Sequence, residues 1–445
     1  MNTPICDFVR DYAGGDALRL HMPGHKGTAF LGLEHLDITE IHGADSLYEA
    51  DGIIAQSEAN ASAVFGCRTL YSTEGSSQCI RAMLYLVQLW AKRAGKPARI
   101  AAGRNAHKTF LTAAALLDLE VDWLYPRENG GYLSCDLKPE DIADYLVKEE
   151  PAAIYLTNPD YLGHMVDISA IAAVCHSRGV LLAVDNAHGA YLRFLPESRH
   201  PMDLGADICC DSAHKTLPVL TGGAYLHLSG NFPEEIGARA KHAMAIFGST
   251  SPSYLILQSL DRANAYLKSY RQMLEPFLAQ LEALKRTLRD DGYGLYGTEP
   301  LKLTIAAKTR GYTGTALAAL LAEKGMVSEF SDEDHLVLMM TPETCADGLK
   351  RLEKALLEIP AADPIAGEAP AMRPGEQVMS IREAMLSGAE SVPAAECLGR
   401  ILAVPTVGCP PAVPIVVCGE RIDDHALRCF EYYGIRECWV VKGDL

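Results

Sequence analysis

The sequence predicts an α/β fold built on a mostly parallel sheet, and three observations support this prediction. Apolar segments of strand length alternate with segments of helix length between residues 68 and 184. Polar residues directly follow several of these strands, as they do where parallel strands end at one edge of a sheet. The chain has 445 residues, which exceeds the roughly 250–300 at which a single core stops growing, so two or three domains are expected.

The N-terminal part of the chain, residues 1–52, lacks this alternation and is expected to form an irregular arm. It contains His21 and His25 in a segment rich in glycine. Two histidines four residues apart can bind a metal from one face of a helix, but Pro23 and Gly24 lie between them and argue against a helix. We therefore predict no metal site.

The alternating part of the chain predicts the elements of a large domain. Each strand is short and apolar, and each following helix is long enough to cross back over the sheet in a right-handed connection. The predicted strands and helices are 68–71 with 80–90, 98–102 with 108–119, 121–125 with 139–147, and 152–157 with 168–178, followed by the strand 180–184.

Beyond residue 250 the pattern predicts smaller α+β domains. A long helix, a small α/β unit, a linker rich in proline and alanine, and a final group of two helices around one strand follow one another. Their ranges are 254–289, then 301–306 with 315–324 and 335–340 with 346–357, then 360–374, and finally 378–385 and 425–433 around the strand 413–418. We divide the chain into an arm (1–52), a large domain (53–250), a linker helix with a small domain (251–360), a linker (361–375) and a C-terminal subdomain (376–445).

Two predicted strand ends carry the residues with the most direct chemical meaning. The apolar run 181–184 ends in Asp185, and a second run leads through Asp211 to Lys215. A lysine and a carboxylate presented together are what pyridoxal phosphate (PLP) requires. The lysine holds the PLP aldehyde as a Schiff base, and the carboxylate keeps the ring nitrogen protonated. We therefore predict that the large domain binds PLP.

A turn that could hold the phosphate of this cofactor follows the first predicted strand. Gly75, Ser76 and Ser77 lie between that strand and a long apolar helix. Free backbone N–H groups and the helix dipole attract an anion to such a turn. The alternative is an ordinary serine-rich helix cap, which this segment alone does not exclude.

Composition limits the class of protein and its compartment. The formal net charge of −17 argues against nucleic-acid binding and is compatible with a cationic substrate, although solubility alone also explains it. No apolar run approaches the roughly 18 residues of a membrane span, and the N-terminus does not have the order of a signal peptide. The 13 cysteines form no C-x-x-C pair and are expected to be reduced thiols. We expect a cytoplasmic protein that binds no membrane.

Several motifs, in order, resemble those of the Orn/Lys/Arg decarboxylases, which are PLP enzymes of the aspartate-aminotransferase-like fold. The motifs cover nearly the whole chain and span residues 20–27, 37–40, 104–108, 185–189, 211–218, 250–254, 380–384, 410–411 and 419–420. The resemblance implies a PLP-dependent aminotransferase-like large domain with a mostly parallel, seven-stranded sheet. It also implies the short form of the family, without the N-terminal response-regulator-like domain.

The resemblance implies a role for each residue of the predicted site. Lys215 forms the internal aldimine, Asp185 pairs with the ring nitrogen, and His107 stacks on the ring. Ala187 packs under the other face of the ring, His188 lies at the cofactor, and Lys215 or His214 returns a proton to the substrate carbon. The residues implied in phosphate binding are Gly75, Ser76, Ser77, Ser212 and His214, with Ser251 or Ser253 from the neighbouring subunit of a homodimer.

The implied reaction is decarboxylation of arginine, lysine or ornithine to the corresponding amine of polyamine biosynthesis. A cationic substrate side chain requires a carboxylate, and the candidates are Glu329, Asp332 and Glu420, each of which could equally be a surface residue. The chain departs from the usual family pattern at positions that include Asp160, Asn186 and Ala412, which leaves the choice among the three amino acids open.

Two alternatives remain at this level. One is another PLP reaction on the same fold, by an aminotransferase or another lyase. Aminotransferases hold the substrate carboxylate with an arginine of the small domain, and between residues 301 and 340 the only arginine is Arg310, in a predicted turn. The other alternative is a non-catalytic regulatory paralogue, against which the intact Lys215, Asp185 and His107 argue.

Overall fold

The structure of the protein is a computed structural model that describes residues 1–127, 130–367, 369–408 and 413–443. The chain divides into two compact units. The first unit comprises Met1–Ala98, Ala152–Ile154 and Ile168–Gln272, and the second comprises Arg99–Pro151, Tyr155–Asp167 and Met273–Leu445. Within the described ranges, no helix is long and apolar enough to cross a membrane.

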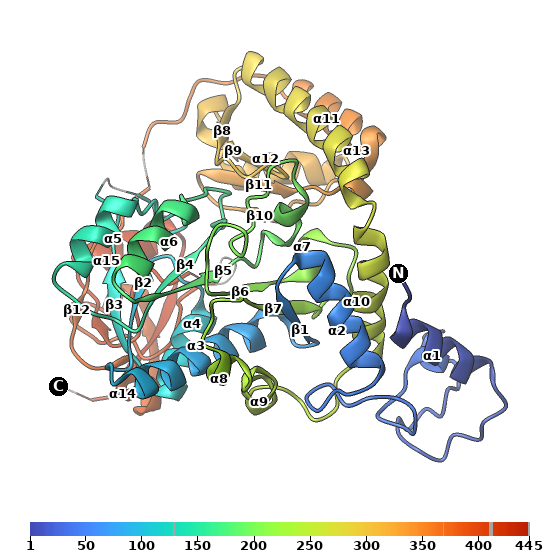
Figure 1. Cartoon of the computed structure of the whole chain (residues 1–445). Coiled ribbons are helices and arrows are strands. Elements are labelled where there is room, and N and C mark those ends of the chain that lie inside the picture. Colours follow the sequence, from blue (N-terminus) through green and yellow to red (C-terminus); the bar gives the residue numbers. More distant parts are fainter. Residues whose placement is uncertain (128–129, 368, 409–412, 444–445) are drawn as a thin grey trace. The chain divides into compact units, whose positions relative to one another are not determined.

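A seven-stranded, mostly parallel sheet is the largest element of the fold (Figure 1), which confirms the predicted fold class. The first five strands along the chain lie within one residue of their predicted ranges, because short apolar runs are typical of buried parallel strands. In spatial order the strands are β1 (Arg68–Ser72), β7 (Ala224–Leu228), β6 (Ile208–Asp211), β5 (Leu181–Asp185), β4 (Ala153–Thr157), β2 (Arg99–Gly103) and β3 (Glu120–Leu124).

Strand β7 is the exception to the parallel arrangement. It runs antiparallel to both of its neighbours, β1 and β6. The pairs β5–β6 and β2–β3 are parallel. The carboxyl ends of β5 and β6 therefore meet at the same edge of the sheet, where parallel α/β sheets carry their functional residues.

The helices of the first unit include most of those predicted there. Helix α3 follows β1 and begins at Gly75, in the predicted serine-rich turn. The helices are α1 (Pro4–Gly14), α2 (Ile53–Phe65), α3 (Gly75–Ala94), α6 (Ile168–Ser177), α7 (Ala213–Thr216), α8 (Glu234–Gly237), α9 (Ala240–Ile246) and α10 (Tyr254–Leu267), with 3₁₀ turns at Glu34–Leu36 and Ala190–Phe194.

Two predictions for this part of the chain were wrong in detail. The arm begins with helix α1, whose first N–H groups, on Ile5 and Cys6, donate to Asp261 at 3.1 and 3.0 Å. That cap comes from a distant helix, so the local sequence does not reveal it. The predicted helix 254–289 is two helices, α10 and α11, separated at Ser269, whose hydroxyl donates to the carbonyl of Tyr266 and competes with a continuous helix.

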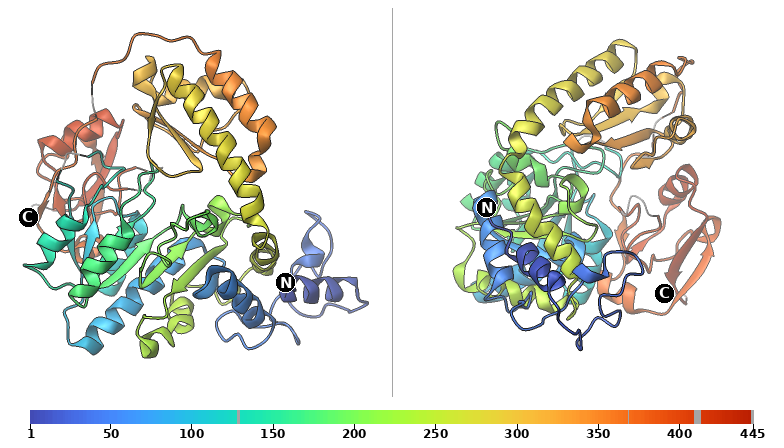
Figure 2. Two further views of the ribbon diagram at one scale, coloured as in Figure 1. Left: turned by 45° about the horizontal axis from the view of Figure 1, so that its top comes forward. Right: turned by 90° about the vertical axis from the view of Figure 1, so that its right-hand side faces the viewer.

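The second unit contains a small antiparallel sheet with helices. Figure 2 shows α11 beside α13, where the Tyr293 hydroxyl donates to the Leu356 carbonyl at 2.7 Å. The strands, in spatial order, are β10 (Phe330–Ser331), β11 (His335–Met339), β9 (Lys302–Ala306) and β8 (Gly294–Tyr296). The helices of this unit are α4 (Lys108–Leu117), α5 (Pro139–Leu146), α11 (Tyr270–Asp290), α12 (Gly314–Glu323), α13 (Cys345–Leu357), α14 (Ile381–Leu386) and α15 (Asp424–Tyr432).

The C-terminal segment has the two predicted helices, α14 and α15, but it forms two short antiparallel ribbons instead of the one predicted strand. The ribbons pair β12 (Glu376–Gln377) with β14 (Glu420–Arg421), and β13 (Ala389–Pro393) with β15 (Glu437–Val441). The predicted strand 413–418 is wrong, since these residues form bends and a turn. The carbonyls of Pro414 and Ile415 accept hydrogen bonds from Arg104, at 2.7 and 2.9 Å. The motif at 410–411 and Ala412 lie outside the described residues.

Candidate active site

Asp185 ends strand β5 and Lys215 follows strand β6, two parallel neighbours of the sheet. Asp185 is the last residue of β5, pairs with Cys210 of β6, and is 2% exposed. Its Oδ1 accepts a hydrogen bond from the Ala187 N–H at 3.2 Å. Lys215 lies in the one-turn helix α7, which begins two residues after β6 ends. The predicted acid and lysine thus both lie at the carboxyl ends of neighbouring parallel strands.

The amine of Lys215 contacts a histidine. Its Nζ lies 2.9 Å from Nε2 of His188, a side chain that is buried in the turn after β5. An ammonium group can only donate a hydrogen bond, so the imidazole accepts it through an unprotonated Nε2. His188 is therefore placed to take a proton from Lys215.

The turn between β1 and α3 has the features of an anion site. Gly75 has a φ of +72°, in the left-handed region that favours glycine. The Ser212 hydroxyl, just after β6, donates to the Ser76 hydroxyl at 2.7 Å. Two hydroxyl groups therefore meet at the N-terminus of α3, where the helix dipole favours a negative charge.

His214 is held as a neutral imidazole beside Lys215. Its Nδ1–H donates to the Gly223 carbonyl at 3.1 Å. Burial lowers the pKa of His214 below its usual value, against the opposing effect of the Gly223 hydrogen bond, and the charge of Lys215 lowers it further. A neutral imidazole in this tautomer has an unprotonated Nε2, which suits accepting a proton better than donating to a phosphate.

The two serines predicted to reach a neighbouring subunit lie in the loop before α10. The Ser253 hydroxyl caps that helix by accepting from the Ile256 N–H at 3.4 Å. Ser251 is exposed, and its N–H donates to the Ser249 hydroxyl at 3.1 Å. The roles of both serines across a subunit interface stay predictions.

His107 belongs to the second unit, where it is the N-cap of α4. Its Nδ1 accepts from the Thr109 N–H at 3.2 Å, and its ring is half-buried. This bond fixes the orientation of the imidazole. The predicted stacking on the cofactor ring stays a prediction.

The three candidate substrate acids have different surroundings within the second unit. Glu329 is exposed and accepts from the Tyr161 hydroxyl at 3.4 Å. Asp332 lines a cavity of about 390 Å³, and its Oδ1 accepts from the His335 N–H at 2.6 Å. Glu420 is 3% exposed and lies 3.7 Å from Arg104; burial raises its pKa, against the effect of Arg104.

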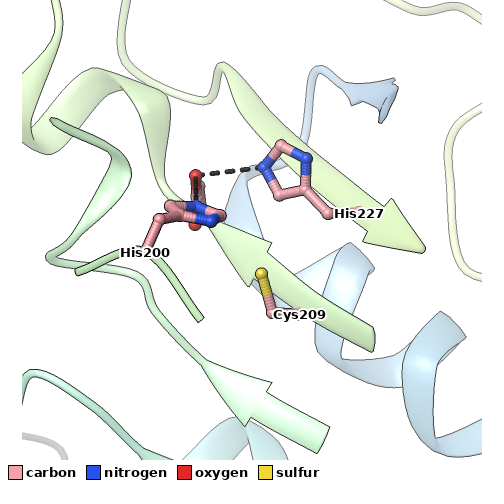
Figure 3. A group of neighbouring side chains, drawn as sticks. His200, Cys209 and His227 are labelled. Carbon is pink, nitrogen blue, oxygen red and sulfur yellow. Dashed lines mark hydrogen bonds and ion pairs between the residues drawn. The ribbon is translucent and has the colours of Figure 1, made fainter. Parts of the chain in front are cut away.

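The side chain of Asp211, which has no role in the site predicted from the sequence, is the centre of a buried network. Its Oδ2 accepts from Nε2 of His200 and from Nε2 of His227, each at 3.0 Å, and all three side chains are 0% exposed. Figure 3 labels the two imidazoles and Cys209, whose ligand atoms lie within 4.8 Å of one another and of the Asp211 carboxylate. His227 lies inside the apolar strand β7, and a histidine in such a run could have indicated a buried polar partner. His200 lies in a loop, where the sequence gives no such indication.

This network predicts a pH dependence of stability. Burial lowers the pKa of His227, but the Asp211 carboxylate and Cys67 raise it more, to about 10. An unfolded histidine titrates near pH ~6.5. The contribution of His227 to stability is therefore fully present below about pH 6.5 and is lost as the pH rises towards 10.

The expected change can be measured between pH 7 and 8. There the folded state holds one proton more than the unfolded chain, so His227 lowers the free energy of unfolding by about 1.4 kcal/mol per pH unit. Urea unfolding of the wild type and of His227→Gln at both pH values isolates this group, and the wild type should lose more stability. Equal losses in the two proteins would contradict a protonated His227.

The sheet and its strand ends define the class of protein as an α/β protein of the aspartate-aminotransferase-like fold. The structure superposes on the constitutive lysine decarboxylase of Escherichia coli with a TM-score of 0.77 and 17% identity, covering 99% of this chain and 82% of that one. It superposes on the lysine decarboxylase LdcF of Francisella novicida with a TM-score of 0.78 and 18% identity, covering 99% and 81%.

Sequence comparison identifies the family within this class. The model of the Orn/Lys/Arg decarboxylase major domain matches residues 3–307, and that of the C-terminal domain matches residues 367–440. The chain therefore belongs to the Orn/Lys/Arg decarboxylase family. An arginine decarboxylase of Bacillus subtilis strain 168 is 29% identical over an alignment of 460 positions, which covers 95% of this chain and 92% of the relative. An uncharacterised protein of the same strain is also 29% identical, in an alignment that covers 96% of this chain and 93% of that protein.

Proposed function

We propose that this protein is a PLP-dependent decarboxylase that converts a basic L-amino acid into the corresponding amine of polyamine biosynthesis. The observation that carries the proposal is the 2.9 Å contact between Lys215 Nζ and His188 Nε2, close in the chain to the buried Asp185. A lysine with a proton acceptor on its amine and a carboxylate at the adjacent strand end suits PLP chemistry. Membership of the Orn/Lys/Arg decarboxylase family supports decarboxylation as the reaction.

The residues of the first unit fit each part of PLP. The N-terminus of α3, with the hydroxyls of Ser76 and Ser212 in contact at 2.7 Å, would hold the phosphate. The buried Asp185 would hold the protonated ring nitrogen, and Lys215 would hold the aldehyde carbon. Ala187, with its small side chain, would leave room for the plane of the ring.

The protein's own groups then have distinct tasks. When bound, PLP supplies an aldehyde that links to amines and a ring that takes up the electron pair left by departing carbon dioxide. His188 accepts a proton from Lys215 Nζ, which brings the amine into its nucleophilic, neutral form. Asp185 favours the protonated ring nitrogen because a nearby negative charge stabilises a positive one. His214, with an unprotonated Nε2, can accept a proton but has none on that nitrogen to give, so Lys215 is the first candidate to return a proton to the substrate carbon.

For the substrate, we expect arginine first, because the B. subtilis relative is named an arginine decarboxylase. Among the three candidate acids we favour Asp332. It lines a cavity, whereas Glu329 is exposed and Glu420 is buried against Arg104. Its Oδ1 already accepts from the N–H groups of Asp334 and His335, so Oδ2 is the oxygen that would accept from a guanidinium group.

Aminotransfer is the weaker alternative. Arg310, the one arginine between residues 301 and 340, lies in a 3₁₀ turn and pairs with Asp291 at 2.7 Å while also donating to the Ile359 carbonyl at 3.1 Å. Its guanidinium group therefore already binds Asp291 and the Ile359 carbonyl within the second unit. An aminotransferase needs such an arginine for the substrate carboxylate.

We also propose a homodimer in the cytoplasm. Large apolar side chains of the arm are strongly exposed, which marks an interaction surface, and a second copy of the chain would cover it. These are Leu18, Leu20, Met22, Phe30, Leu31 and Leu33. The 12 cysteines described as free thiols support a reducing compartment.

Incubation of the purified protein with PLP and each of arginine, lysine and ornithine tests the proposed function. We expect the amine to accumulate from at least one of them, with arginine the first candidate. A preparation that binds PLP but forms amine from none of the three would contradict the proposal.

Asp332→Asn should then raise KM for the preferred substrate more than it lowers kcat, because the lost charge acts on binding.

A further inference from the structure

The buried network around Asp211 reaches the segment that carries the proposed cofactor residues. Asp211 uses both carboxylate oxygens: Oδ2 accepts from His200 and His227, each at 3.0 Å, and Oδ1 accepts from the side-chain amide of Asn186 at 2.6 Å. Asn186 stands between Asp185 and Ala187, and it is 0% exposed. One carboxylate therefore joins two imidazoles to the chain that leaves β5.

With Cys209, three residues of this network could suggest a metal site. The ligand atoms of His200, Cys209, Asp211 and His227 lie within 4.8 Å of one another. The hydrogen bonds argue against it. The Met202 N–H donates to Nδ1 of His200 at 3.3 Å, so the proton of that neutral ring is on Nε2, the atom that faces Asp211. A nitrogen that carries a proton has no lone pair for a metal.

His227 donates in the same way. The Thr69 hydroxyl lies 3.2 Å from the Cys67 carbonyl, to which it donates, and 2.9 Å from Nδ1 of His227, from which it can then accept. This contact, together with the pKa of His227 that Asp211 and Cys67 raise, assigns protons to both nitrogens, so His227 forms a buried ion pair with Asp211. Three donors surround the Asp211 carboxylate, as a buried charge requires.

Asn186 is fixed from several sides. Besides the bond to Asp211, its N–H donates to the Cys210 carbonyl at 3.0 Å, and its carbonyl accepts from the Gly189 N–H at 2.8 Å. Its side chain also packs on Gly189, where a Cβ would lie 2.0 Å from Asn186 Oδ1. The path of residues 185–189, which include His188, therefore depends on where this amide is held.

We propose that His200 and His227 are positioning residues that act through Asp211 and Asn186 to hold Asp185 and His188 in place for the cofactor. This inference rests on the proposed function for the identity of the cofactor. None of the side chains of this network is among the residues assigned to the cofactor or the substrate. The network sets the backbone from which the cofactor-binding side chains project, so its loss should weaken PLP binding in protein that is still folded.

An exchange of the acid and the amide provides the test. In Asp211→Asn, the new amide has one NH₂ group in place of a carboxylate oxygen. In one orientation this NH₂ group faces the NH₂ group of Asn186, and in the other it faces the N–H groups of the two imidazoles. In Asn186→Asp, two carboxylates meet. In the double variant Asn186→Asp/Asp211→Asn the amide NH₂ faces the carboxylate and the amide oxygen faces the two imidazoles. One carboxylate remains in the pair, so the double variant should recover what each single variant loses.

The main readout is the dissociation constant for PLP, from absorbance titration at a temperature where circular dichroism shows every variant folded. Each single variant should bind PLP about tenfold more weakly or worse, because buried donors or charges lose their partners. The double variant should return to within about threefold of the wild type. The matched control is Asp207→Asn, since Asp207 bonds His176 and the Leu182 N–H near the opposite end of β5, at 3.0 and 2.7 Å. It should lower the melting temperature without weakening PLP binding.

A second measurement uses the unaltered protein and needs no variant to fold. Nitrogen-15 NMR of the imidazoles at pH 7 should find both nitrogens of His227 and Nε2 of His200 protonated. An unprotonated Nε2 on either ring, or a stoichiometric metal that is lost in Asp211→Asn, would overturn the inference. Unchanged PLP binding in the single variants, or a double variant as weak as they are, would also overturn it. Wild-type protein that binds no PLP would instead overturn the proposed function, so the two failures are distinguishable.

Discussion

Replacing Lys215 with alanine is expected to abolish amine formation and to remove the absorbance band that bound PLP gives near the visible edge. The Lys215 amine is the group that contacts His188 and that the proposed chemistry requires. Loss of such a nucleophile lowers kcat by about 10³-fold or more. Amine production and the absorbance spectrum of the two proteins, measured side by side, check the prediction.

Lys92→Ala is the control for this experiment, because Lys92 is an exposed lysine of helix α3 in the same unit. It should keep both the band and the activity. Amine formation by Lys215→Ala at the wild-type rate would refute the assigned role of Lys215. A wild-type band without amine from any basic amino acid would favour the non-catalytic paralogue.

Replacing Arg104 with alanine is expected to have the largest effect on stability. The guanidinium is 0% exposed, donates to the carbonyls of Pro414 and Ile415 at 2.7 and 2.9 Å, and lies 3.7 Å from the Glu420 carboxylate. The variant leaves the buried Pro414 carbonyl, the half-buried Ile415 carbonyl and a buried carboxylate without their cation. Breaking a buried ion pair from one side costs about 3–5 kcal/mol.

Arg127 offers a matched control within the same unit. Its side chain is 59% exposed and pairs with Asp141 and Asp144. Surface ion pairs contribute about 0–1 kcal/mol, so Arg127→Ala should change the urea midpoint little. Similar losses in the two variants would contradict the importance of the buried pair. The double variant Arg104→Met/Glu420→Leu should be less destabilised than Arg104→Ala, because it leaves no unpaired charge.

Much of the large sheet was predictable from the sequence because its strands are encoded locally. Strand β5 is four apolar residues followed by Asp185, and all five of its residues are buried. Such a run needs no distant partner to be recognised. The reversed direction of β7 was not predictable in this way, since strand direction depends on how the connection after Lys215 runs in space.

Predictions failed where a distant residue decides the local structure. Residues 413–418 are apolar enough for a strand, but the Pro414 carbonyl is bonded by Arg104, 310 positions away in the sequence. Helix α1 lacks a capping side chain of its own, and Asp261 supplies the acceptor. A local pattern contains neither contact.

The candidate site was predictable to a similar degree. The strand ends indicated Asp185 and Lys215, and the helix N-terminus indicated Ser76, whose contact with Ser212 the structure adds. The network of Asp211 was missed because His200 comes from an irregular loop and Asn186 looked only like a departure from the family pattern. Their grouping depends on the pairing of β5, β6 and β7.

The most direct test of the central claim is the stoichiometry of the reaction with carboxyl-labelled arginine in the presence of PLP, followed by lysine and ornithine. A basic amino-acid decarboxylase releases the label as carbon dioxide and forms one amine for each molecule released. We predict this one-to-one ratio for the wild type with at least one of the three substrates. Loss of the amino group with the label retained in the product would contradict it and would identify an aminotransferase instead.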